Sequence, residues 1–291
     1  MELPLVVGVD GSVPSLGAVD WAVDEAARHG IPLRLVYASL WERYEGETPS
    51  DSLDRPSDET LADTIVGTAA ERARRRNPGV KVAAEVQPEE AVAALLREGR
   101  NAFAIVIGSR GRGGISGLLL GSVSLAVAAR AHCPVIVVRG DEAAVAGTHG
   151  RILLGVGDLA AGSNAVRFAF REAEARGCTL DAVRAWRRPA HEALDHPLVT
   201  GDASTFHEMR AATLLDEALG KAGDDHPAVR VHHTTVEGSA RKVLLERSAA
   251  ADLLIVGAER RQGHFGLELG RLAHTALHHA PCPVAVVPQR V

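Results

Sequence analysis

A glycine-rich segment contains the residues of this chain best suited to bind an anion. Residues 108–122 read GSRGRGGISGLLLGS and are predicted to follow a buried strand and to open a helix. Glycines allow a positive φ and let backbone N–H groups approach a ligand closely. The start of a helix carries about half a positive charge and unpaired N–H groups. We therefore expect an anion site at Gly121 and Ser122, with Arg110 and Arg112 as nearby charges.

The same segment has a simpler interpretation, a flexible surface loop with a serine helix cap. A second copy of the segment, later in the chain, keeps four of its glycines in register, which favours a requirement on backbone geometry. The segment is not a Walker A loop, because GxxxxGK[ST] is absent and the three lysines of the chain lie elsewhere. The GxGxxG fingerprint of dinucleotide-binding folds is also absent after the first predicted strand.

An acidic residue is predicted to lie beside the glycine segment. The first apolar run ends in VGVDGS, which contains Gly8 and Asp10. In an open parallel sheet of order 3-2-1-4-5, strands one and four are neighbours, and ligands bind at their carboxyl ends. Asp10 and Gly108 fall at these two ends, where a carboxylate suits a ribose hydroxyl or a base amine and the glycine segment suits phosphates. The alternative for Asp10 is structural, an Asp-Gly turn or a helix cap.

The elements that would position these residues occur twice. Residues 5–38 align with 152–185 at an offset of 147, and 103–138 align with 252–287 at an offset of 149. We therefore predict two domains, 1–146 and 147–291, joined through a small and polar stretch. The apolar final strands, 134–138 and 283–287, are predicted to pair with each other within the chain, because an exposed apolar edge invites aggregation.

Each unit alternates apolar runs with helical periodicity, which predicts an α/β fold. In the first unit the predicted strands are 3–9, 32–38, 80–86, 103–108 and 134–138, and the predicted helices are 14–29, 58–76, 89–100 and 121–131. Continuously apolar strands indicate a doubly wound parallel sheet of five strands, covered on both faces. The polar segments 39–57 and 187–204 are predicted to be loops.

The spacing Gly-x2-Gly-x9-Gly-Ser, formed by Gly108, Gly111, Gly121 and Ser122, resembles the ATP-binding motif of the universal stress protein family. The VGVDGS opening and the HCPVIVV ending are similar too, and the match covers nearly the whole chain. The resemblance implies two Rossmann-like domains in tandem, a regulatory role in the stress response, a homodimer, and ATP, alone or with Mg²⁺, in the first domain. The implied binding residues are Gly8, Asp10, Ala38 beside the base, Gly108, Ser109, Arg110, Gly111, Arg112, Gly113, Gly121, Ser122, Val123 and Ser124.

The second unit departs from this pattern at the positions that would hold the ligand. Asp10 falls on Gly157 (with Asp158 next to it), Arg110 on Glu259, Gly111 on Arg260, and Ser122 on Arg271. A glutamate repels phosphate, and an arginine at a helix start opposes the helix dipole. We expect the second site to be weak or empty; the alternative is that its arginines reach phosphates in another geometry.

Composition and the remaining motifs exclude several classes of function. A net charge of -5 argues against a nucleic-acid partner, and the absence of a long apolar run argues against a membrane span. Three scattered cysteines fit a reducing cytoplasm, with Cys133 and Cys282 expected to be buried. We predict no metal at the helical pair His274 and His278, and we interpret the arginines between 72 and 76 as a solvated helix end.

Without an identifiable general base, the sequence favours an ATP-binding regulator that is not an enzyme. The alternatives are an enzyme of the same fold that hydrolyses ATP or transfers nucleotidyl groups, and a ligand-free dimerisation module.

Overall fold

In a computed structural model, the chain consists of two compact units, Met1–Arg139 and Gly140–Val291. The structure describes residues 2–39, 58–111, 120–158, 163–188, 203–258, 261–263 and 266–289. The sequence placed the division after residue 146, and the segment that precedes this point forms a short helix, α6 (Glu142–Ala146), in the second unit. The predicted loops 39–57 and 187–204 fall almost wholly outside the described residues.

The first unit contains one five-stranded parallel sheet, of strand order β3-β2-β1-β4-β5. Its elements are β1 (Leu5–Gly8), α1 (Val13–His29), β2 (Leu33–Ala38), α3 (Asp58–Arg76), β3 (Val82–Gln87), α4 (Ala91–Glu98), the 3-10 turn η1 (Gly99–Asn101), β4 (Ala104–Gly108), α5 (Ser122–Arg130) and β5 (Val135–Val138). The order and the parallel sense are those that the sequence predicted.

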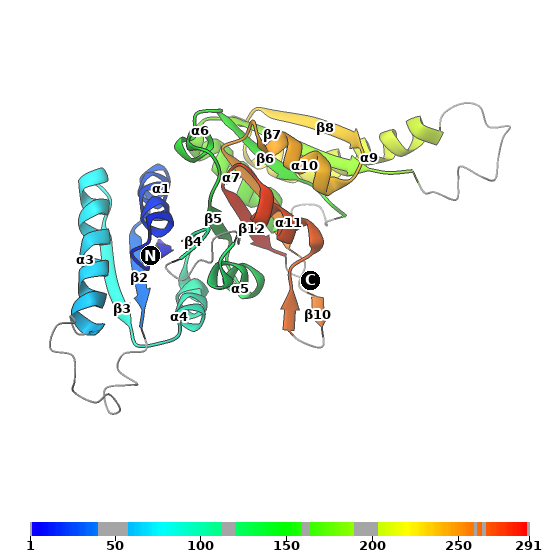
Figure 1. The fold of residues 1–291 in the computed structure, drawn as a ribbon. Helices are drawn as coiled ribbons and strands as arrows, with labels where there is room; N and C mark the ends of the chain where they lie inside the picture. The colour runs from blue at the N-terminus through cyan, green and yellow to red at the C-terminus, as the bar shows by residue number, and fades with distance from the viewer. Residues whose placement is uncertain are drawn as a thin grey trace. The chain divides into compact units, whose positions relative to one another are not determined.

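Two helices cover each face of this sheet. Helices α1 and α3 pack together on one face, and α4 and α5 pack together on the other (Figure 1). Because both faces are covered, strands β1, β4 and β5 are apolar along their whole length, and the residues of β4 are all buried. Helix α1 begins at the cap Ser12, whose side chain accepts a hydrogen bond from Ser15 N, and ends at Gly30 in the left-handed conformation.

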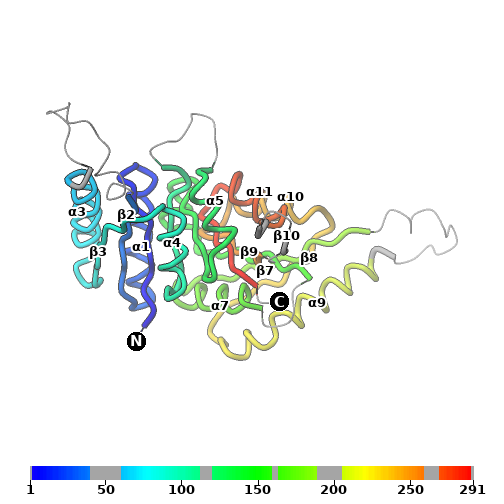
Figure 2. The backbone as a smooth tube through the Cα atoms, turned by 90° about the horizontal axis from the view of Figure 1, so that it is seen from below, coloured from blue at the N-terminus to red at the C-terminus, as the bar shows by residue number. Residues whose placement is uncertain are grey.

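The second unit repeats the arrangement with the order β8-β7-β6-β9-β12. Its main elements after α6 are β6 (Arg151–Gly155), α7 (Asn164–Arg176), β7 (Thr179–Trp186), α9 (Ala203–Asp225), β8 (Val231–Glu237), α10 (Ala240–Ser248), β9 (Leu253–Ala258), α11 (Arg271–His279) and β12 (Val284–Pro288). Helices α10 and α11 lie side by side on one face of this sheet (Figure 2), and α7 and α9 pack together on the other. The prediction of two doubly wound α/β domains is confirmed.

One short element of the second unit was not predicted. Strands β10 (Arg261–Gly263) and β11 (Gly266–Glu268) pair antiparallel in the segment that aligns with the glycine-rich segment of the first unit. The glycines at 263 and 266 are paired with each other at the end of this ladder. The sequence indicated only a loop here, because three residues are too few for a detectable strand period.

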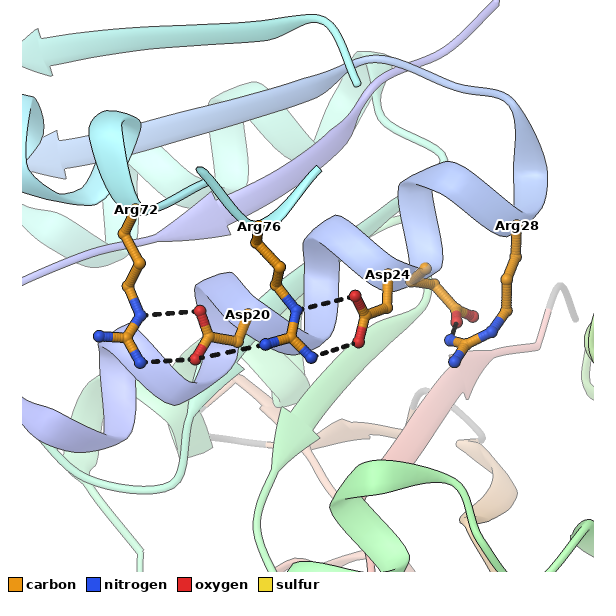
Figure 3. A network of polar contacts seen from close by, with 6 residues as sticks. Asp20, Asp24, Arg28, Arg72 and Arg76 are labelled. Atoms are coloured by element: carbon orange, nitrogen blue, oxygen red, sulfur yellow. Dashed lines mark hydrogen bonds and ion pairs between the residues drawn. The ribbon is translucent and has the colours of Figure 1, made fainter. Parts of the chain in front are cut away.

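Two arginines of the predicted solvated helix end form ion pairs instead. Arg72 binds both carboxylate oxygens of Asp20, at 2.7 and 2.6 Å, and Arg76 binds both of Asp24, at 2.8 and 2.7 Å (Figure 3). The hydrogen bond to Asp20 raises the pKa of Arg72. These pairs fasten α3 to α1. Both arginines remain exposed, as the interpretation of a solvated helix end expects, but the sequence did not predict their ion pairs.

The fold buries two of the three cysteines. Cys133 and Cys282 are buried as predicted, Cys178 is half-buried, and none of these three described cysteines forms a disulfide. Burial raises the pKa of Cys133 to about 12, so this thiol stays protonated at neutral pH.

Among the described residues, no helix combines the length and apolarity needed to cross a bilayer.

Candidate functional site

The carboxyl ends of β1 and β4 lie side by side in the first unit. The two strands are paired in parallel, with Val7 opposite Val106, and they end at Gly8 and Gly108. The helix that follows β1 packs on one face of the sheet and the helix that follows β4 packs on the other. This divergence opens a crevice at the strand ends, where ligands of doubly wound folds bind.

A cavity of about 510 Å³ occupies this crevice, a volume in the range of small-molecule sites. It is lined by Gly8, Val9, Asp10, Ser15, Val36, Tyr37, Ala38, Ala91, Leu95, Ile107, Gly108, Arg110, Gly111, Leu120, Gly121, Ser122, Val123 and Ser124. The aliphatic side chains supply an apolar wall. The polar groups come from the turn after β1, the turn after β4 and the start of α5, together with Ser15 on α1 and Tyr37 on β2.

The carboxylate of Asp10 is held in the turn after β1. Its Oδ1 accepts hydrogen bonds from Ser12 N, at 3.0 Å, and from Ser12 Oγ, at 2.6 Å. Its Oδ2 lies against Gly111, at a point that a Cβ on that residue would occupy. The structural interpretation of Asp10, a turn beside a helix cap, therefore holds, and the same residue also lines the cavity.

The glycines at this site are needed for close packing. A Cβ on Gly108 would lie 2.7 Å from the carbonyl carbon of Pro14, and a Cβ on Gly8 would lie 3.0 Å from Ile107. None of Gly8, Gly108, Gly111 and Gly121 has φ in the left-handed region. Of the two reasons that the sequence suggested, close approach therefore applies to Gly8, Gly108 and Gly111, while a Cβ on Gly121 would make only ordinary contacts, and a positive φ applies to none of the four.

The start of α5 presents backbone donors to the cavity. Gly121 is its N-cap, and Gly121 N donates to the carbonyl of Ser109 at 2.8 Å. The first bond within the helix runs from Leu125 N to Gly121 O, so the N–H groups of residues 122–124 precede the helical ladder. The hydroxyl of Ser124 donates to the carbonyl of Gly108 at 2.9 Å and thereby joins this helix to the end of β4.

Most of the predicted site residues come together around the cavity. Those that line it are Gly8, Asp10, Ala38, Gly108, Arg110, Gly111, Gly121, Ser122, Val123 and Ser124. Ser109 is not among the lining residues and acts through its carbonyl, and Arg112 and Gly113 lie outside the described residues. Sequence reasoning missed Ser15 and Leu95, because the approach of α1 and α4 to the strand ends depends on packing that local patterns do not reveal.

The corresponding turn of the second unit is organised differently. Gly157 brings no carboxylate, and Asp158 binds the guanidinium of Arg184, which also donates to the carbonyl of Gly157. Arg184 is buried whereas the side chain of Asp158 is 93% exposed, so this acid does not take the place of Asp10. Arg184 was not predicted, since nothing in β7 marks which turn its side chain reaches. Glu259 and Arg260 lie outside the described residues, and Arg271 is the exposed first residue of α11.

Comparisons with known proteins agree with the fold and with the repeat. The family model for the universal stress protein family matches residues 3–139 and 148–288. The chain belongs to the universal stress protein family. A universal stress protein of Mycolicibacterium smegmatis is 30% identical to it, over 99% of this chain and 98% of the relative. A universal stress protein of Mycobacterium tuberculosis is also 30% identical, over 98% of this chain and 97% of the relative.

A solved structure with the same architecture is the crystal structure of a universal stress protein from Archaeoglobus fulgidus. It superposes with a TM-score of 0.66 over 98% of each chain, at 19% identity. The likeness supports the two-domain α/β fold.

Proposed function

We propose that the first unit binds an adenine nucleotide, ATP, in the cavity between the ends of β1 and β4. The observation that carries the proposal is the presence of two complementary groups in one cavity of about 510 Å³: a carboxylate at Asp10 and an open helix start at residues 122–124. A nucleotide has an anionic end and a nucleoside end, and these two groups suit the two ends. In this arrangement the phosphates, alone or with Mg²⁺, lie at the start of α5 near Arg110, and the base lies beside Ala38 along the apolar wall.

The proposed role is regulation through binding. Within the described lining of the cavity, the one carboxylate belongs to Asp10, which is already engaged by Ser12, and the lining contains no histidine or lysine. General acid–base catalysis uses an acid or base within reach of the reacting group. We therefore expect phosphate release from pure protein to fall well below the usual enzymatic range of about 1–1,000 per second. Release at several per second would favour the enzyme alternative.

The test of binding is calorimetric titration of the full chain with ATP. We expect about one nucleotide per chain, and we expect Gly121→Asp to abolish binding because it places a carboxylate at the proposed phosphate position. Gly270→Asp, at the matching position of the second unit, is the control and should leave binding unchanged. Two equivalent sites in the wild type, or unchanged affinity in Gly121→Asp, would contradict the proposal. A ligand-free dimerisation module would bind no ATP at all.

Two further parts of the proposal rest on family resemblance and composition. We propose that the chain acts in the cytoplasm as a homodimer, with neither nucleic acid nor a membrane as its partner. Sedimentation at several protein concentrations tests the dimer separately from nucleotide binding.

A further inference from the structure

Ser12 connects the carboxylate of the cavity to helix α1. Its hydroxyl donates to Asp10 Oδ1 at 2.6 Å and accepts a hydrogen bond from Ser15 N at 3.3 Å. Its backbone N–H donates to the same Oδ1 at 3.0 Å. One side chain therefore caps the helix and orients the acid. Because a hydroxyl is both donor and acceptor, the two bonds are made together.

The surrounding bonds leave the turn little freedom. Ser15, which is buried and lines the cavity, donates through Oγ to the carbonyl of Ser12 at 3.0 Å and accepts from Asp10 N at 3.4 Å. On the other side, Oδ2 of Asp10 lies against Gly111. The carboxylate is thus fixed at one oxygen by the turn and confined at the other by the start of the glycine-rich segment.

We propose that Ser12 is a positioning residue: it holds the Asp10 carboxylate ready for the ligand and couples occupancy of the cavity to the first turn of α1. The inference rests on the proposed binding of nucleotide in the first unit. A carboxylate that is already oriented loses less conformational freedom when it binds a ligand. By linkage, a ligand that prefers this orientation stabilises the Asp10–Ser12 bonds in return, and with them the helix cap.

The second unit provides a matched control. Helix α7 also begins with a serine cap, Ser163, whose Oγ accepts a hydrogen bond from Val166 N at 3.4 Å. Here glycine stands at the position that matches Asp10. Ser163→Ala therefore removes a helix cap of the same kind without touching the proposed site, and it separates loss of a cap from loss of positioning.

The first test is a double-mutant cycle on the Kd for ATP, measured by calorimetry on the full chain. Ser12→Ala should raise the Kd about tenfold, and it should have no further effect in the Asp10→Ala background. Ser163→Ala should lower the Tm about as much as Ser12→Ala does and leave the Kd unchanged. A wild-type Kd in Ser12→Ala, or an equal effect of this change in both backgrounds, would overturn the role of Ser12 while the proposed function stands. No ATP binding by the wild type would instead remove the proposed function, and this inference with it.

The second test is hydrogen exchange in the presence and absence of saturating ATP. In the wild type, ATP should slow exchange at the amides of Ser12 and Ser15 as well as at residues 122–124. In Ser12→Ala, protection of 122–124 should persist at saturation, whereas protection of the first turn of α1 should be lost. If that turn is protected equally in both proteins, or in neither, the coupling is wrong even though protection at 122–124 shows that ATP is bound.

Discussion

Asp10 and Gly111 are a matched pair, because the carboxylate of the first occupies the space that a side chain on the second would need. The second unit changes both positions: Gly157 replaces the aspartate and Arg260 replaces the glycine. Once the carboxylate is absent, nothing at that position requires a glycine opposite to it. We therefore expect the two substitutions to be linked in the second unit, since without the aspartate a glycine at position 260 is no longer needed to make room for it.

Gly111→Ala should weaken ATP binding about tenfold or more, since the new Cβ overlaps Asp10 Oδ2 and forces the carboxylate to move. The Tm should change little, because Gly111 is exposed. Gly121→Ala is the control at the same site: its Cβ would have its nearest neighbours at 3.7 Å, an ordinary contact, so the Kd should change much less. Calorimetric titration measures the Kd for ATP of both variants. An equal loss of affinity in the two would refute the steric argument.

The sequence was sufficient to predict most of the residues that line the cavity, but not the hydrogen bonds between them. Glycine spacing indicated Gly108, Gly111 and Gly121, of which Gly108 and Gly121 recur in the second unit. An added side chain would clash at Gly108 and at Gly111, but not at Gly121. The bonds from Ser12 to Asp10 and from Ser124 to Gly108 depend on side-chain rotamers, which spacing does not encode. The reach of Arg184 to the neighbouring turn escaped prediction for the same reason.

At the scale of the elements, apolar runs and helical periods in the sequence predicted nearly every strand and helix. The predicted helix 58–76 coincides with α3, because its apolar stripe and its flanking turns are both visible in the sequence. The helical period of a sequence does not show which neighbouring helix its polar face will contact. The pairing of Arg72 and Arg76 with α1 therefore required the structure (Figure 3).

These pairs between α1 and α3 should contribute modestly to stability. Arg76→Ala should lower the free energy of unfolding by about 0.5–1 kcal/mol, because a bidentate pair this exposed is screened by water. The loss should shrink in 1 M salt, where the Debye length falls to about 3 Å. Arg74→Ala, which changes an exposed arginine of the same helix, serves as the control in urea titrations. An Arg76→Ala effect that does not respond to salt would show that packing of the side chain, not charge, fastens the helices.

At the scale of the whole molecule, the two units keep one fold while they reverse an internal ion pair. In the first unit Arg34 of β2 binds Glu98 of α4 at 2.7 Å, and in the second Asp181 of β7 lies 3.6 Å from Arg247 of α10. Arg34 and Asp181 correspond in the repeat alignment, and the offset of 149, extended back from residue 103, places Glu98 on Arg247. Exchange of the two helices between units would bring like charges together. We therefore expect these pairs to disfavour mispairing of the repeats during folding.

Charge reversal within one unit tests this argument. Glu98→Arg should destabilise the protein by about 1–3 kcal/mol, since Glu98 is largely buried while Arg34 is partly exposed and can recover some hydration. Adding Arg34→Asp places the acid on the strand and the arginine on the helix, as in the second unit. The double variant should recover a substantial part of the lost free energy of unfolding. Urea denaturation of both variants measures the coupling. A double variant no more stable than Glu98→Arg alone would mean that the reversed pair in the second unit relies on other neighbours, such as Arg151.

The apolar last strand of each unit offers a reason why the chain contains two units. Strand β5 has the sequence VIVV and follows a proline. Within the sheet of the first unit it pairs with β4 and is the outermost strand on that side. An apolar strand with an open edge pairs readily with another chain. We predict that 134–138 and 283–287 cover each other within the full chain, so the separate segment 1–146 should form homodimers through this edge. Analytical ultracentrifugation of that segment should give a dimer at micromolar concentration, with ATP bound by each copy if the site is independent of the second unit. A fragment that stays monomeric and soluble at every concentration would mean that the edge of β5 is protected from within its own unit, and the two-unit chain would then need another explanation than mutual burial of these strands.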